Sequence, residues 1–150
     1  MRKSAILTTT LTVSAISAAT LVCGASANAY PREETIGLHC YGQNPNILLF
    51  PFYGGARVTL NTPVRGQISI SSDSKDPIPY TTDTTVRVTD LRTNRTQTYH
   101  RRWQHSLSDI GGYRIDGIAA RGRTRVSVSA VNHGLFQTLR GPTCTGIVSA

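Results

Sequence analysis

Apolar and polar residues alternate along much of this chain, as in β-strands that bury one face and expose the other. Segment 124–131 shows the pattern best, and the side chains expected to face a core there are Thr124, Val126, Val128 and Ala130. Few windows repeat apolar residues at the three- and four-residue spacing of a helix. Gly, Pro, Asn and Asp separate the alternating segments, so the sequence predicts short strands joined by turns.

About eight short strands follow from this pattern, spaced roughly 8–15 residues apart. They are expected at 35–41, 47–53, 57–60, 67–71, 84–89, 96–103, 113–118 and 124–131, with a final segment at 135–144. The polar stretch 71–79 is predicted to be a surface loop, and 90–95 a hairpin turn. Two antiparallel layers would bury the apolar faces of such strands.

The run GYRIDGIAARGRTRVSVSAVNHG resembles the end of an immunoglobulin-like sandwich, where a strand leads through a turn into a strongly alternating penultimate strand. The resemblance covers the last seventy or so residues and is one of pattern. We therefore expect an all-β, immunoglobulin-like antiparallel β-sandwich.

The first 29 residues have the features of a secretory signal peptide. Basic residues at positions 2 and 3 precede an apolar stretch rich in Thr and Ser, and the tripeptide Ala-Asn-Ala ends at Ala29. We expect export and cleavage after Ala29. Lipidation at Cys23 is disfavoured, because Val22 is bulky for a lipoprotein cleavage box.

The mature chain is expected to have a short polar tail at 30–35 and a single domain at 36–150, with no transmembrane helix. Its two cysteines, Cys40 and Cys144, lie near the two ends of the domain. In an oxidising compartment such a pair is most simply a disulfide, here joining the first and last strands. No CxxC spacing indicates redox chemistry.

The chain is basic, with 16 Lys and Arg against 8 Asp and Glu. Removing residues 1–29 takes away two basic residues and no acidic one, which leaves an excess of six positive charges. Arginine strongly outnumbers lysine, as in GC-rich coding, and we expect a bacterial origin. A basic exported protein is attracted to anionic cell-wall polymers, phospholipid headgroups or extracellular nucleic acid, although no specific nucleic-acid motif is present.

Arg121, Arg123 and Arg125 alternate into the strand predicted at 124–131 and would line its solvent face. Guanidinium groups bind phosphate and carboxylate with two parallel hydrogen bonds, so the stripe could bind anions. Strands also need a polar outer face for solubility, and the pattern favours that simpler interpretation. If 121–122 is still a turn, the stripe shortens to Arg123 and Arg125.

The segment YHRRWQH, 99–105, contains the one tryptophan of the chain and presents a conflict of register. In a regular strand Tyr99, Arg101 and Trp103 share one face, and an arginine in a dry core costs several kcal/mol unless it is paired. A β-bulge could turn Arg101 outward, and the sequence favours this solution. Alternatively, the face is partly exposed, and Arg101 stacks between the two rings as part of a binding platform.

Little in the sequence indicates catalysis. The four histidines are scattered, no metal-ligand or phosphate-loop spacing occurs, and no nucleophile motif surrounds a serine. His100 or His105 with Asp109 is the best remaining catalytic group. We expect a small exported binding protein without cofactor, engaging a cell-surface polymer or a protein. The alternatives are a secreted inhibitor or toxin-like effector presenting loop 71–80, and a hydrolase with an unrecognised site.

Overall fold

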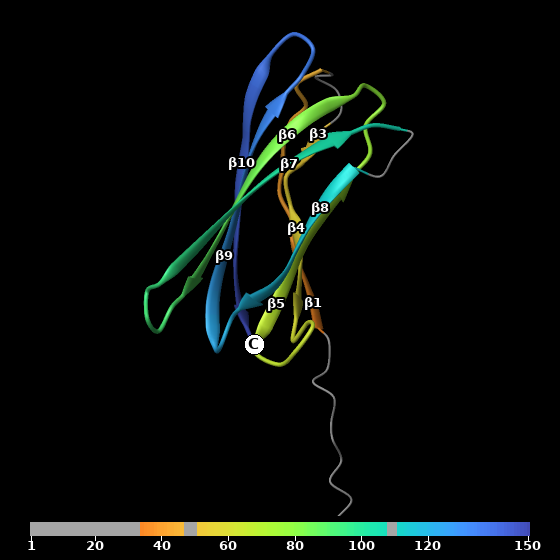
Figure 1. Cartoon of the computed structure of the whole chain (residues 1–150). Helices are drawn as coiled ribbons and strands as arrows, with labels where there is room; N and C mark the ends of the chain where they lie inside the picture. Colours follow the sequence, from red (N-terminus) through yellow and green to blue (C-terminus); the bar gives the residue numbers. More distant parts are fainter. Residues whose placement is uncertain (1–33, 47–50, 108–110) are drawn as a thin grey trace, which may run out of the picture.

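A computed structural model describes residues 34–46, 51–107 and 111–150, and the described residues form ten β-strands and no helix (Figure 1). The strands are β1 (Glu34–Leu38), β2 (Tyr41–Gln43), β3 (Pro51–Tyr53), β4 (Ala56–Leu60), β5 (Gln67–Ser74), β6 (Tyr80–Asp90), β7 (Thr96–His105), β8 (Gly111–Ala119), β9 (Arg123–His133) and β10 (Thr138–Ser149).

The strands form two four-stranded antiparallel sheets with the orders β1-β4-β5-β8 and β10-β9-β6-β7, plus a small sheet of β2 and β3. The chain crosses from one large sheet to the other after β5, after β7 and after β8. The predicted all-β antiparallel fold is therefore confirmed. The finer assignment to an immunoglobulin-like sandwich stays a prediction.

One continuous core lies between the two large sheets, and the alternation in the sequence explains which side chains enter it. The inward positions predicted for β9 are all buried, and so are Val86 and Val88 on β6 and Ile68 and Ile70 on β5. Burying each such Val or Ile side chain contributes roughly 1.5–3 kcal/mol relative to exposure. Removing these side chains from water drives the two sheets together.

Cys40, which directly follows β1, and Cys144 on β10 form the predicted disulfide across 104 residues of sequence, with Cα atoms 5.8 Å apart. The bridge ties the first and last strands together. Closing a loop of this length removes about 4–5 kcal/mol of chain entropy from the unfolded state.

Several predicted boundaries shift. The first predicted strand is divided into β1 and β2, and β1 begins at Glu34, inside the predicted tail. Strand β5 continues to Ser74, so the loop predicted over 71–79 is confined to 75–79. Residues 47–50 of the second predicted strand lie outside the described residues, as do the signal peptide and Cys23.

Because consecutive long strands run in opposite directions, alternate connections fall at the same end of the sandwich (Figure 1). The β4–β5, β6–β7 and β8–β9 connections lie at one end, near the last residue of the chain. The β5–β6 and β9–β10 connections, together with the end of β7 and the start of β8, lie at the opposite end. This alternation decides which loop side chains are neighbours.

Candidate functional site

The YHRRWQH segment lies in β7, and β7 contains no bulge. Its pairing with β6 is unbroken from Tyr80 opposite His105 to Thr89 opposite Thr96. The bulge favoured by the sequence is therefore a wrong prediction. Trp103 and His105 face inward as the two-residue period requires, and the residues between and beside them face outward.

Arg101 avoids the core because β7 is the edge strand of its sheet. The side chains of β7 are exposed or half-buried from Thr96 to Arg102 and become buried only at Trp103. Its neighbour on β6, Thr84, is buried at the same register, so the core reaches this level under β6 and leaves the outer strand β7 open to solvent. Arg101 Nη1 donates to His100 O at 2.9 Å, and Tyr99 is half-buried at the margin of the core.

Trp103 is 7% exposed, so its ring is not available as a stacking platform. Its indole Nε1–H donates to Thr84 Oγ1 at 2.9 Å, and its ring lies against His105 with centroids 3.9 Å apart. His105 is also stacked on Tyr80, with centroids 4.0 Å apart. These residues form an internal aromatic cluster rather than a ligand surface.

His105 is fully buried, which lowers its pKa from 6.5 to about 4. Its Nε2 lies 2.8 Å from Thr82 Oγ1, which donates in turn to Asn132 Oδ1 at 2.8 Å. With this direction of donation, the neutral imidazole carries its proton on Nε2. His105 is therefore enclosed where a substrate cannot reach it, which argues against the catalytic role considered for it. Asp109 lies outside the described residues.

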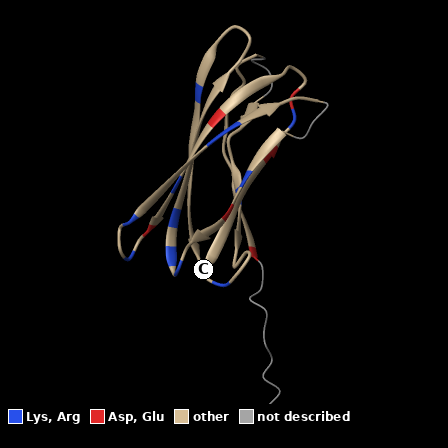
Figure 2. Ribbon diagram, in the orientation of Figure 1, with Lys and Arg blue, Asp and Glu red and all other residues tan. Residues whose placement is uncertain are grey.

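The predicted arginine stripe on β9 is the shorter of the two predicted forms and consists of Arg123 and Arg125. Arg123 and Arg125 are exposed on β9, whereas Arg121 precedes the strand in a turn with Gly122, whose φ of 78° favours glycine. The structure adds three exposed arginines at the same end of the sandwich, from the β4–β5 and β6–β7 connections. We call the whole set the arginine end: Arg65, Arg92, Arg95, Arg121, Arg123 and Arg125. Figure 2 shows blue segments in the connections at this end and at the start of β9.

Sequence reasoning missed Arg65, Arg92 and Arg95, although a usable signal exists. Each lies in a predicted turn, and counting alternate turns of an antiparallel sandwich places all three beside Arg121. The described parts of the opposite connections contain one basic residue, Lys75.

Backbone hydrogen bonds join the connections of the arginine end. Ala120 N donates to Gly66 O at 3.0 Å, and Leu91 N donates to Arg123 O at 3.1 Å. Gly122 N donates to Ala150 O at 2.9 Å. The arginine side chains therefore extend from a shared, hydrogen-bonded base.

None of the six arginines forms an ion pair with a carboxylate among the described residues. Ion pairs occur elsewhere, between Arg57 and Asp73, Arg102 and Asp83, and Arg114 and Asp116. Asp90 and Glu34 lie at the arginine end, but neither has an arginine nitrogen within 4.0 Å in the described part of the chain. The arginine end therefore keeps a net positive charge.

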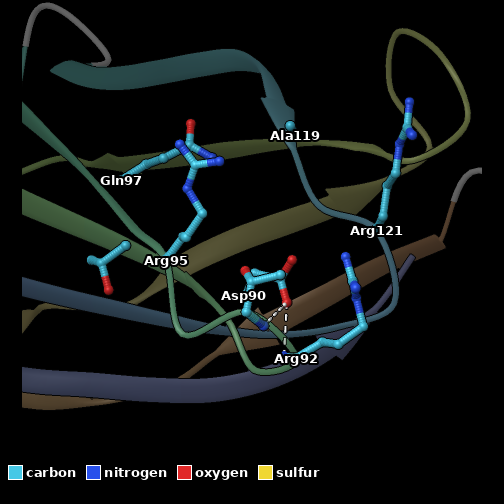
Figure 3. Close-up of a pocket in the computed structure, with 8 residues that line it drawn as sticks. Asp90, Arg92, Arg95, Gln97, Ala119 and Arg121 are labelled. Carbon is cyan, nitrogen blue, oxygen red and sulfur yellow. Dashed lines mark hydrogen bonds between the residues drawn. The ribbon is translucent and has the colours of Figure 1, made fainter.

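A hollow of about 380 Å³ opens at the arginine end, between the β6–β7 turn and the end of β8 (Figure 3). It is lined by Asp90, Arg92, Thr93, Arg95, Thr96, Gln97, Ala119 and Arg121. A hollow of this size is within the usual range of small-molecule sites. Its polar lining and three guanidinium groups suit an anion.

The described residues contain no group of three His, Cys, Asp or Glu arranged to hold a metal ion. They also contain no helix with the length and hydropathy needed to cross a membrane. The chain matches no protein-family model, and comparisons with curated proteins and with solved structures also find no match.

Proposed function

We propose that this protein is an exported binding protein that attaches to an anionic cell-surface polymer through the arginine end. The main support is that six exposed arginines share one end without an ion-pair partner among the described residues, whereas Arg57, Arg102 and Arg114 are paired. Like charges held close together repel one another, and a polyanion relieves that repulsion when it binds.

Export rests on the signal peptide expected over residues 1–29 and on the disulfide. A structural disulfide persists in oxidising compartments and is rare where thiols are kept reduced. The Cys40–Cys144 bridge is therefore compatible with a protein that works outside the cell.

Binding to a purified sulfated polysaccharide, heparin, over a range of salt concentrations tests the proposal. The variant R121Q/R123Q/R125Q removes three positive charges from the arginine end. The matched control R57Q/R102Q/R114Q removes three charges that are paired with Asp73, Asp83 and Asp116. We expect the first variant to lower the slope of log affinity against log salt by about 2–3, at roughly 0.7–0.9 per lost contact, and the control to change it little.

Equal losses in the two variants would reject the arginine end as the binding surface, because net charge alone would then explain retention. Salt-independent binding by the wild-type protein would also reject it.

The inhibitor alternative relied on an exposed loop over 71–80, and the contacts of that segment favour a structural role. Asp76 is buried, accepts from Asn44 Nδ2 at 2.5 Å and accepts from Ile78 N at 3.1 Å. A loop held from inside in this way has little freedom to adapt to a protease. Leu135 and Phe136, at the tip of the β9–β10 hairpin, are the more exposed loop residues, with Phe136 91% exposed.

A hydrolase would now have Asp83, His133 and Thr138 as its group to test. His133 Nε2 lies 3.0 Å from Asp83 Oδ2, and His133 Nδ1 lies 3.2 Å from Thr138 Oγ1. These are the residue types of a nucleophile, a base and an orienting acid. The three residues lie on adjacent strands β6, β9 and β10, so a cross-strand tether explains them without a substrate.

A further inference from the structure

The hollow at the arginine end differs from the rest of that surface because arginines from two separate connections line one concave site. Arg92 and Arg95 belong to the β6–β7 turn, and Arg121 belongs to the β8–β9 connection. In Figure 3 the side chains of Arg92 and Arg95 rise from the turn on either side of Asp90, and that of Arg92 extends toward the connection carrying Arg121. Arg92 and Arg95 therefore flank the hollow, and Arg121 lines its edge with a side chain that extends toward the β4–β5 connection.

Asp90 is the one carboxylate among the lining residues, and its role is to hold the turn. Its Oδ1 accepts from Arg92 N at 2.8 Å and from Thr93 N at 3.1 Å. The hydrogen bond from Arg92 N, followed by that from Thr93 N, lowers the pKa of Asp90 below its ordinary value. The carboxylate thus shapes the turn, and the hollow keeps two positive charges in excess.

The backbone beneath the hollow is fixed on both sides. Asp90 N donates to Arg95 O at 3.0 Å, and Asn94 closes the turn with a φ of 54°. Leu91 N donates to Arg123 O, which connects the turn to the start of β9. A ligand therefore needs to order side chains but no loop, and this reduces the entropic cost of binding.

We propose that this hollow binds a phosphate group of a sugar-phosphate or polyol-phosphate chain. The inference rests on the proposed function and names the ligand class for part of that surface. A tetrahedral phosphate offers oxygens in several directions, which suits guanidinium groups arriving from two connections, whereas a carboxylate offers two oxygens in one plane.

The neutral lining supports the attached sugar or polyol. Gln97 Oε1 accepts from Tyr99 Oη at 2.7 Å, and Thr96 Oγ1 pairs with Thr89 Oγ1 at 2.9 Å. These bonds leave the Gln97 amide NH₂ and the second lone pairs of the hydroxyls to meet alcohol groups of the ligand. The lining contains no aromatic residue on which a nucleobase could stack. The chemistry therefore favours a polyol- or sugar-phosphate over single-stranded nucleic acid.

Two variants of equal charge separate the hollow from the surrounding surface. R92Q/R95Q/R121Q removes the three arginines of the hollow, and R65Q/R123Q/R125Q removes the other three of the arginine end. Calorimetry with a defined poly(glycerol phosphate) oligomer should show at least about a 30-fold loss of affinity for the first variant and only a few-fold loss for the second. Thermal unfolding of both variants checks that they fold.

A lysine variant, R92K/R95K/R121K, keeps the charge and removes the paired donors of guanidinium. We expect it to lose about tenfold in affinity, because lysine acts as a point charge. Affinity equal to that of the wild-type protein would overturn the claim that guanidinium geometry is used.

The remaining outcomes distinguish this inference from the proposed function. Equal losses in the two triple glutamine variants would overturn the hollow as a site and leave the arginine end as a diffuse binding surface. No loss in either variant would overturn both. Oligogalacturonate of equal charge, bound as tightly and with the same dependence on the hollow, would overturn the phosphate preference. Tighter binding of oligothymidylate would overturn the polyol-phosphate assignment in favour of nucleic acid.

Discussion

At one end of the sandwich, Asn44 donates to Asp76, and Asn46 Oδ1 accepts from Leu135 N at 2.8 Å. At the other end, six arginines extend into solvent without an ion-pair partner among the described residues. Both ends are built from connections between β-strands, and the end with Asn44 and Asn46 also includes the chain that follows β2. The two ends differ in whether their polar side chains hydrogen-bond with the rest of the protein or extend into solvent, where a ligand can reach them.

This difference separates structural polar residues from functional ones. Asn44 and Asp76 are buried and hold the loop before β6 in place, and their loss would be felt as lost stability. The arginines are exposed and their removal should leave the fold intact, so their loss would be felt as lost binding. Variants at the two ends should therefore have opposite phenotypes.

The largest expected effect comes from removing the framework that both ends share. The double variant C40S/C144S should lower the free energy of unfolding by about 4–5 kcal/mol, because the unfolded chain regains its loop entropy. Urea unfolding of the wild-type and variant proteins measures this. A loss below about 1 kcal/mol would show that the bridge contributes little. Heparin binding of the folded fraction should not change.

Acid should destabilise the core by a smaller amount. His105 has a pKa of about 4 when folded and about 6.5 when unfolded, so the unfolded state binds more protons between these values. Stability from this group is complete above about pH 6.5 and falls by about 3 kcal/mol as the pH drops to 4.

Unfolding curves at several pH values, followed by the emission of Trp103, test this dependence. The variant H105F should remove the slope that His105 contributes, whereas H100N, at an exposed position, should keep it. An unchanged slope in H105F would contradict the assignment of the slope to His105.

At the end opposite the arginines, D76A should cost about 2–3 kcal/mol. It removes the buried carboxylate that accepts from Asn44 Nδ2 and from Ile78 N. The same unfolding assay measures the cost, and heparin binding should stay at the wild-type level. Reduced binding with unchanged stability would reverse the roles assigned to the two ends.

The smallest expected effect on stability is that of R92Q/R95Q/R121Q. These exposed residues should change the free energy of unfolding by less than about 0.5 kcal/mol. A loss above about 2 kcal/mol, measured by urea unfolding, would show that the arginines hold the connections together and would weaken the functional interpretation.

Much of the fold was predictable because it depends on local periodicity. The inward positions of β9, the hairpin turn at 90–95 and the Cys40–Cys144 pair all follow from residue types and spacing. Arg101 was not predictable in the same way. Its exposure depends on β7 being the edge strand of its sheet, and the order of strands in a sheet is a tertiary property.

The candidate site shows the same limit. Arg123 and Arg125 could be placed on one face from alternation alone. Arg65, Arg92 and Arg95 lie in turns, and their proximity to Arg121 depends on which connections share an end. That information is present in the strand order, and applying it requires knowing which segments are strands.

Chemical-shift mapping compares the two ends most directly. Amide and arginine Nε–H resonances would be followed while a short polyphosphate is added at low salt. The account predicts shifts concentrated in the β6–β7 and β8–β9 connections and at Arg92, Arg95 and Arg121, with little change around Asn46, Asp76 and Phe136. Shifts centred on that opposite end, or spread evenly over the surface, would contradict it.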